Sequence, residues 1–495
     1  MLKSRINRIF LSGLLALNIG IASCSRSPKL EERVAMDLPA SIEFQPDYEK
    51  TLERVIITHK SYPPENPTIN EYYSFIRKED NNGIRARVSI IRNLPEYSKV
   101  FLICDKDTKP LFEAEIAKLN TSVQERVSIS LAEMHFPRDA FSQDMGAGNG
   151  TNFILRNDYP YLITNLNLSG FNVLNSRSVG DGWGNKLLAR NAFGEKIVFV
   201  GSTLAETDSK NLDQSLDYVK EMYKQTFNAD KAVIIPNLNT HPDLQSRSMI
   251  HLDQVISFGN DGFAFIAKLP DTNEKVGRIY DGFLRKFKRV QNKGIDSENI
   301  MDYFVLKEAF FPEGRRYIPV LYTPKSLREK LTESQFNVLS EHGLYLGLFY
   351  HEHISRKLRA TEETLAKNGF ETYHLHMDLV NMALRQSPLN MTVFTEKESG
   401  KKAVLFPIFG PVNREDSKKE FSGMILSFPE SYSSLMQEAE DKLIADYSLI
   451  FSGKKSDLEL EQDNMLRIQQ KGFELISVPG EDMRGGNLHC LMNPL

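Results

Sequence analysis

The chain has 495 residues, of which 41% are hydrophobic and 25% are charged, the balance of an ordinary globular protein. This length suits two or three typical domains, or one large domain built from repeats. The formal net charge is −4, and no basic block is long enough to indicate binding to nucleic acid.

The N-terminus has the pattern of an export signal. Three basic residues precede an apolar run that is too short to span a bilayer. The run ends in small residues and Cys24, which is similar to the cleavage and lipidation site of bacterial lipoproteins. We therefore expect a signal peptide over residues 1–23 and a lipid on Cys24. The lipid would hold the protein on a bacterial membrane outside the cytoplasm, at the outer membrane or the periplasmic face. The alternative is a plain signal peptide with an incidental cysteine.

Residues 24–75 carry several prolines among charged residues, which predicts a tether with little regular structure. The folded part is then expected over residues 76–495. Within it, residues 285–345 match no repeated unit, and their mixture of charged and aromatic residues is interpreted as an insertion.

One unit recurs along the folded part: an amphipathic helix, a short break, a strand, and a loop with polar residues. Early copies place a helical stripe over Leu212–Phe227 and strands at Val127–Ser130 and Ala232–Ile235. Two later copies have Gly-Phe-Glu between helix and strand, at Gly369 and Gly472, where glycine suits a left-handed helix end. Repeated helix–strand units predict an α/β fold, with ligand-binding loops at the ends of the strands.

Two hairpins are predicted between these units. An Asn-Asp-Gly turn separates the apolar runs Val255–Phe258 and Phe263–Ile266, which is a strong hairpin signal. A polar turn with Gly400 separates Met391–Thr395 from Ala403–Ile408.

The chain has three cysteines, and each has a different setting. Cys24 lies in the lipidation signal, whereas Cys104 ends an apolar run and is expected to be buried. Cys490 lies in the glycine-rich run Gly485-Gly486-Asn487-Leu488-His489-Cys490, a setting that suits a reactive thiolate. A Cys104–Cys490 disulfide is the alternative, and no Cys/His pattern indicates a metal site.

Two polar clusters could complete a site around the Cys490 thiol. They are Arg138-Asp139 and His251-Leu252-Asp253, and each follows a predicted strand. An imidazole transfers protons, and paired carboxylates bind the N–H edges of a planar cation such as a guanidinium. Taken alone, Arg-Asp is more typical of a surface ion pair, and His-x-Asp is a short signal.

Together these motifs resemble those of the guanidino-modifying, or pentein, superfamily. Its members include agmatine, peptidylarginine and arginine deiminases and the amidinotransferases. The run from Gly485 to Cys490 resembles the final Gly-Gly-Asn-hydrophobic-His-Cys motif of the deiminases. Their His-x-Asp and Arg-Asp motifs are similar to His251-Leu252-Asp253 and Arg138-Asp139, and Trp183-Gly184 resembles a Trp-Gly turn of the agmatine deiminases.

The resemblance implies a pseudo-symmetric five-bladed α/β propeller with insertions and a site at its axis. It implies a hydrolase that converts a guanidino group of arginine, of arginine in peptides or of an agmatine-like substrate to a ureido group and ammonia, without metal or cofactor. Cys490 would be the nucleophile, His251 the general acid and base, and Asp139 and Asp253 the catalytic carboxylates that clamp the substrate. The remaining substrate-binding residues would be Arg138, Trp183 and Asn487.

Several alternatives remain open at this point. An amidinotransferase uses the same thiol, and a lipoprotein without catalysis could keep the fold as a binding scaffold. A rival His-x-Asp pair exists at His376-Met377-Asp378. His489 is interpreted as structural, because neighbours on an extended chain point to opposite sides. Ala140 after the Arg-Asp pair and Val200-Gly201-Ser202 depart from the agmatine deiminase pattern, and the sequence gives no oligomeric state.

Overall fold

The computed structural model describes residues 43–59, 80–132, 146–155, 162–175, 183–236, 251–269, 354–377, 387–409, 457–479 and 488–494. These ranges form a mixed α/β fold, as the sequence predicts, with one four-stranded and four three-stranded sheets. In the same ranges, no helix has the length and apolar character needed to cross a membrane. The expected signal peptide, Cys24 and the expected insertion at 285–345 lie outside the described residues.

Four of the sheets share one strand order. Two strands form an antiparallel pair, and a third strand lies parallel to the second after a helical connection. In chain order the elements are β4 (Gly146–Gly148), β5 (Asn152–Leu155), α8 (Ile163–Leu168) and β6 (Asn172–Asn175); β7 (Lys186–Arg190), β8 (Lys196–Gly201), α9 (Ser202–Leu212), α10 (Leu216–Thr226) and β9 (Lys231–Ile235); β10 (Ile256–Asn260), β11 (Phe263–Lys268), a helix over 354–367 and β12 (Glu371–His376); and β13 (Thr392–Thr395), β14 (Lys402–Ile408), α18 (Asp457–Gln470) and β15 (Glu474–Pro479). This common order confirms that the chain repeats one α/β unit.

The fifth sheet joins the two ends of the described chain. β16 (Met492–Pro494) pairs antiparallel with β1 (Arg54–His59), and β1 pairs parallel with β2 (Lys99–Cys104), the order of the other four sheets. One further parallel strand, β3 (Val127–Leu131), extends the sheet. Its helices are α4 (Asp80–Asn93), α5 (Lys109–Ile116) and α6 (Thr121–Glu125).

The fifth sheet corrects the expected tether over residues 24–75. The 3-10 helix η1 (Asp47–Glu49) and β1 lie within that range and belong to the folded body. The physical reason is the apolar run Val55-Ile56-Ile57, whose side chains are fully buried in β1. The prolines on both sides of this run led to the prediction of a tether, although the run itself has the apolar character of a strand.

The glycine-ended helices are confirmed. Gly369 and Gly472 both have φ of 84°, and each is followed by a buried phenylalanine and a strand. A third copy of the same ending, which the sequence analysis did not identify, occurs at Gly170 with φ of 79° before β6. The predicted stripe over Leu212–Phe227 is two helices instead of one, because the chain turns through a left-handed residue, Asp213, between α9 and α10.

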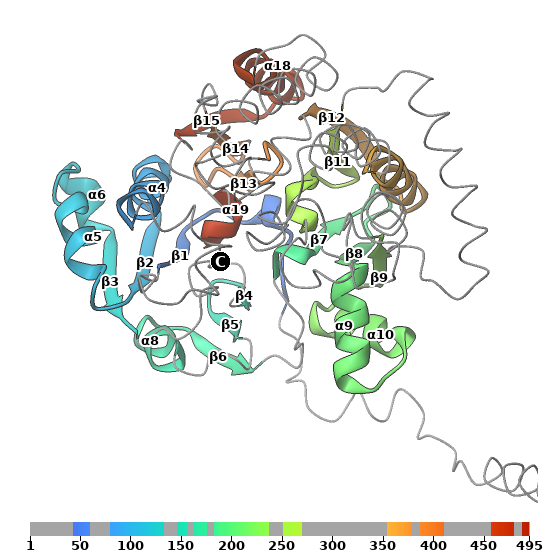
Figure 1. Ribbon diagram of the computed structural model, residues 1–495, viewed down its shortest axis with the longest axis horizontal. Helices are drawn as coiled ribbons and strands as arrows, with labels where there is room; N and C mark the ends of the chain where they lie inside the picture. The colour runs from blue at the N-terminus through green and yellow to red at the C-terminus, as the bar shows by residue number, and fades with distance from the viewer. Residues whose placement is uncertain are drawn as a thin grey trace, which may run out of the picture.

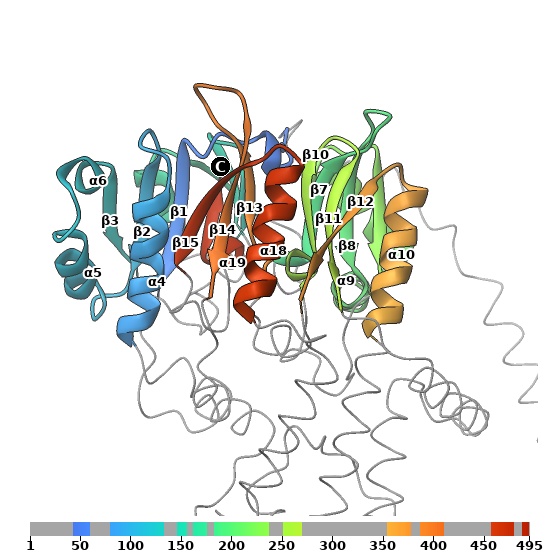
Figure 2. The same ribbon diagram turned by 90° about the horizontal axis from the view of Figure 1, so that it is seen from above.

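Both predicted hairpins are confirmed, as β10–β11 and β13–β14. Figure 1 shows the sheets placed around the short helix α19 (Leu488–Leu491), with α4, α9, α10 and α18 on their outer sides. Seen from above in Figure 2, the strands of neighbouring sheets stand side by side.

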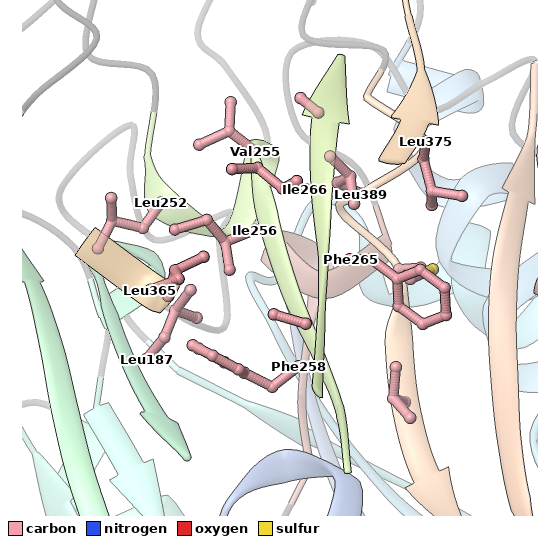
Figure 3. Packing of buried hydrophobic residues seen from close by; sticks show 14 of the residues in the cluster. Leu187, Leu252, Val255, Ile256, Phe258, Phe265, Ile266, Leu365, Leu375 and Leu389 are labelled. Atoms are coloured by element: carbon pink, nitrogen blue, oxygen red, sulfur yellow. The ribbon is translucent and has the colours of Figure 1, made fainter. Parts of the chain in front are cut away.

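The largest core cluster joins neighbouring sheets. Phe258 of β10 stacks on Phe199 of β8 at 5.2 Å between ring centroids, and Phe370 packs edge-on against Phe199 and tilted against Phe258. Figure 3 shows Leu252, Val255 and Ile256 at the start of β10 within the same cluster. Burial of large apolar side chains on both sides of Asp253 holds this loop against its neighbours.

Candidate active site

The His-x-Asp motif lies on a single 3-10 turn that leads into β10. This turn is η6 (Leu252–Gln254), and His251 is its N-cap residue. Leu252 is buried in the core, whereas Asp253 is 2% exposed and His251 is half-buried. An apolar residue between two polar ones therefore anchors the turn and presents both polar side chains on its other side.

The Trp-Gly turn packs directly against this motif. It forms the 3-10 helix η4 (Trp183–Asn185), and the Leu252 backbone N–H donates to Asn185 Oδ1 at 3.2 Å. A Cβ atom at Gly184 would lie 2.7 Å from Asp253 Oδ2 and 3.0 Å from His251 Nδ1. Gly201 backs onto Asn185 in the same way, with 2.3 Å between a Cβ at Gly201 and Asn185 Oδ1. Two glycines thus make room for the polar side chains of the site.

Replacing Gly184 by alanine is expected to lower the catalytic activity of this site by about 10²-fold, since a displacement of about 1 Å at a reacting group has that effect. The new methyl group must push Asp253 or His251 out of place, because both lie within 3.0 Å of it. The kcat/KM of the purified variant measures the effect.

Gly400→Ala is the control for a generic loss of glycine. A Cβ at Gly400 meets nothing within 4 Å, although its φ of 67° strains any other residue. It should reduce stability by about 1 kcal/mol and leave activity unchanged. Full activity of Gly184→Ala would mean that Asp253 and His251 need no fixed geometry.

His489 completes a buried cluster with Asp253. It lies in α19 and is 5% exposed. Its Nδ1 is 3.0 Å from Asp253 Oδ2, and its Nε2 is 3.1 Å from Asp47 Oδ2. A protonated imidazole donates a hydrogen bond from each nitrogen, so this geometry suits the charged form. His489 lies in a helix and not on the extended chain assumed from the sequence, and its ring belongs to the cluster around Asp253.

Asp47 and Lys50 were missed by the sequence analysis. Asp47 begins η1, and its Oδ1 lies 2.8 Å from the Lys50 Nζ, which also donates to the Pro494 carbonyl at 2.9 Å. The only signal for this segment was the apolar run of β1 that follows it. No pattern in the sequence connects these residues to a motif more than four hundred positions away.

The electrostatics of the cluster follow from these contacts. Burial lowers the pKa of the His489 imidazole, but its hydrogen bonds to Asp253 and Asp47 outweigh burial and raise the pKa to about 9. Burial raises the pKa of the Asp47 carboxyl, but the Lys50 charge and the His489 hydrogen bond hold that pKa well below its usual range. At neutral pH the protonated His489 ring therefore contacts the negative Asp47 carboxylate, which also pairs with Lys50.

A small pocket lies beside this cluster. Its polar lining includes Asp47, Asp253 and His489, and apolar side chains such as Leu187 and Met391 form other walls. Apolar walls strengthen the attraction between opposite charges, because they reduce screening by water. Asn390, on the loop before β13, supports the cluster through its carbonyl, which accepts from the His489 backbone N–H at 3.2 Å.

Other predicted site residues are not placed by the described structure. Arg138, Asp139 and Asn487 lie outside the described residues, and the side chains of Trp183 and Cys490 are likewise outside them. Their roles stay predictions. The backbone of Cys490 is described, in α19 directly after His489.

The remaining candidates lie away from the cluster. Cys104 is fully buried in β2, and burial raises the pKa of its thiol to about 12, as expected of a core residue. His376, of the rival His-x-Asp pair, lies in β12 with its Nδ1 3.5 Å from Asp463 of α18. Its partner Asp378 lies outside the described residues. No cluster of metal-ligating side chains occurs in the described part of the chain.

Comparison with known proteins adds to this description of the fold. No family model and no curated protein matches the sequence. Among solved structures, a protein provisionally named an agmatine deiminase matches with a TM-score of 0.50 at 11% identity, covering 91% of this chain and 95% of that one.

Two further structures match over similar lengths. One is provisionally named a peptidyl-arginine deiminase, with a TM-score of 0.48, 12% identity, and coverage of 92% of this chain and 98% of that one. The other is an agmatine deiminase of C. jejuni with substrate bound, with a TM-score of 0.45, 12% identity, and coverage of 92% and 97%. The chain has the fold of the guanidino-modifying, or pentein, superfamily.

Proposed function

We propose that this protein is a cysteine-dependent hydrolase that converts a guanidino group to a ureido group and ammonia. The observation that carries the proposal is the 3.0 Å contact between Asp253 and His489, which are 236 positions apart in the sequence. This contact brings the His-x-Asp motif to the residue that directly precedes Cys490. The fold shared with a protein provisionally named an agmatine deiminase supports the same reaction class.

The proposed reaction has two halves that share one covalent intermediate. The Cys490 thiolate adds to the central guanidinium carbon, forming an S–C bond and a tetrahedral adduct. His251 gives a proton to the departing nitrogen, the C–N bond breaks, and ammonia leaves a thiouronium on the sulfur. His251 then takes a proton from water, and the hydroxide adds to the same carbon. The S–C bond breaks to regenerate the thiolate, and the proton left on the new oxygen passes to solvent, which gives the neutral ureido product.

Carboxylates supply the counter-charge that a buried guanidinium needs. Asp253 is 2% exposed, so a negative charge at this position is well placed for a desolvated cation. In the proposal Asp253 and Asp139 clamp the two N–H edges, which holds the carbon in line with the sulfur. Arg138, Trp183 and Asn487 bind the rest of the substrate, which is arginine, arginine in a peptide or an agmatine-like molecule.

The repeated sheets support a specific architecture for this site. In the proposal each of the five sheets is one blade of a pseudo-symmetric propeller, and β16 completes the blade that β1 and β2 begin. Loops at the inner ends of the blades then surround the substrate near α19. In the proposal a lipid on Cys24 also anchors the protein to a membrane outside the cytoplasm, which favours arginine in peptides or proteins as the substrate.

The test is an assay of purified protein that lacks residues 1–24 with arginine, agmatine and arginine-containing peptides, without any added amine. We expect ureido product and ammonia in equal amounts from one of these substrate classes. Turnover that requires an added amine and releases no ammonia would identify an amidinotransferase. Binding of a guanidino compound without turnover would favour a non-catalytic scaffold.

A further inference from the structure

The cluster around His489 contains one carboxylate more than the reaction motifs predict. Asp253 holds Nδ1 of the ring, and Asp47 holds Nε2 from a segment 442 positions away. Asp47 also accepts from Lys50, so both of its oxygens have cationic or N–H partners. A carboxylate that accepts at both oxygens favours its ionised form.

The two carboxylates together determine the proton content of His489. A neutral imidazole has one N–H, so it could donate to Asp47 or to Asp253 but would turn a lone pair toward the other. Between two ionised carboxylates, only the protonated ring satisfies both contacts. Because Asp253 is 2% exposed, it also needs a counter-charge in the absence of substrate, and protonated His489 is positioned to provide it.

We propose that Asp47 is a positioning residue for deimination, which holds His489 protonated and thereby fixes the Asp253 carboxylate in the orientation that receives the guanidinium. This inference rests on the proposed function and extends it to a residue outside the reaction motifs. Among the described residues, the charged or titratable groups around the bridge are Lys50 and Tyr48 on η1 and also His251, which lies with Asp253 against Gly184.

The proposal predicts a particular pH dependence. The pKa of His489 is raised from 6.5 to about 9, so the two-sided bridge is intact at neutral pH and is lost as the pH rises through about 9. Removing the charge of Asp47 lowers the pKa of His489. The activity then begins to fall at a lower pH on the alkaline side, while the acidic side stays the same.

The experiment compares the wild type with Asp47→Asn, and follows the His489 ring by NMR as well as kcat/KM across the pH range. We expect the His489 pKa to fall by about one unit, and kcat/KM at pH 8.5 to fall about threefold while its value at pH 6 stays unchanged. Asp47→Glu, which keeps the charge, should restore most of both values.

Glu49→Gln is a matched control on the same 3-10 helix. Glu49 pairs with Arg190 at 3.0 Å and lies on η1 with Asp47, so this variant removes an equal charge without touching His489. Its pH profile should match the wild type. An equal shift in both variants would indicate a general effect of charge, and would overturn the inference.

The outcomes separate this inference from the proposed function. If the wild-type protein deiminates no guanidino compound, both the proposed function and the role of Asp47 are contradicted. If the wild type is active and Asp47→Asn changes neither the pH profile nor the His489 pKa, only the inference about Asp47 is contradicted. If Asp47→Asn does not fold, the wild-type spectrum decides, since a neutral His489 ring at pH 7.5 contradicts the inference and a protonated ring supports it.

Discussion

Replacing Cys490 by alanine is expected to reduce the formation of ureido product by about 10⁴-fold or more. The proposed reaction forms its covalent bond at this thiol, and no other group in a site can substitute for an absent nucleophile. Cys490→Ser should be nearly as inactive, because a hydroxyl ionises far less readily than a thiol. Ammonia release and ureido product, measured on the same samples, check both variants.

Cys104→Ala is the matched control for this prediction. Cys104 is fully buried in β2 with its thiol pKa raised to about 12, so it should neither react nor contribute to catalysis. A haloacetamidine probe should add one label to the wild type and to Cys104→Ala, and none to Cys490→Ala, by intact-protein mass spectrometry. More than about 1% residual activity in Cys490→Ala would refute the assignment of the nucleophile.

Replacing Asp253 by asparagine is expected to lower kcat/KM by about 30-fold to 4,000-fold. The change keeps the shape of the side chain but removes a buried charge that serves two partners, the substrate guanidinium and His489. Truncating one side of a buried charge pair costs about 2–5 kcal/mol, and each 1.4 kcal/mol is a factor of ten. Steady-state kinetics over a wide substrate range measures the loss in kcat and in KM separately.

Asp261→Asn provides the comparison for Asp253→Asn. Asp261 lies in the turn between β10 and β11 and accepts a hydrogen bond from the Tyr48 hydroxyl at 2.9 Å. Asparagine can still accept that bond, so activity should stay within about twofold of the wild type. A loss of similar size in both variants would show that the effect of Asp253 is on folding and not on the substrate.

The local parts of this fold could be predicted from the sequence. Hairpins and helix ends depend on residues within a few positions of one another, such as the Asn-Asp-Gly turn before Phe263 and the glycine at 369. The antiparallel pair of β16 and β1 could not be predicted, because short strands from opposite ends of a chain leave no joint pattern. β1 itself was also not predicted, because the prolines on both sides of it indicated a tether.

The site shows the same division between local and distant information. The motif resemblance identified Asp253 and the Trp-Gly turn, which the structure brings into contact through Gly184. It gave no indication of Asp47, because the role of that residue exists only once η1 lies beside α19. His489 was visible in the motif, but its two carboxylate partners depend on the fold.

The sheet that joins β16 to β1 makes the proposed site depend on the pairing of two segments from distant parts of the chain. β16 is three residues long, and its contacts span more than four hundred positions, so closing them has a high cost in chain entropy. Fraying of either end would separate His489 from Asp47 while the phenylalanine-rich core between β8 and β10 stays intact. In mild denaturant, inactivation should therefore precede global unfolding.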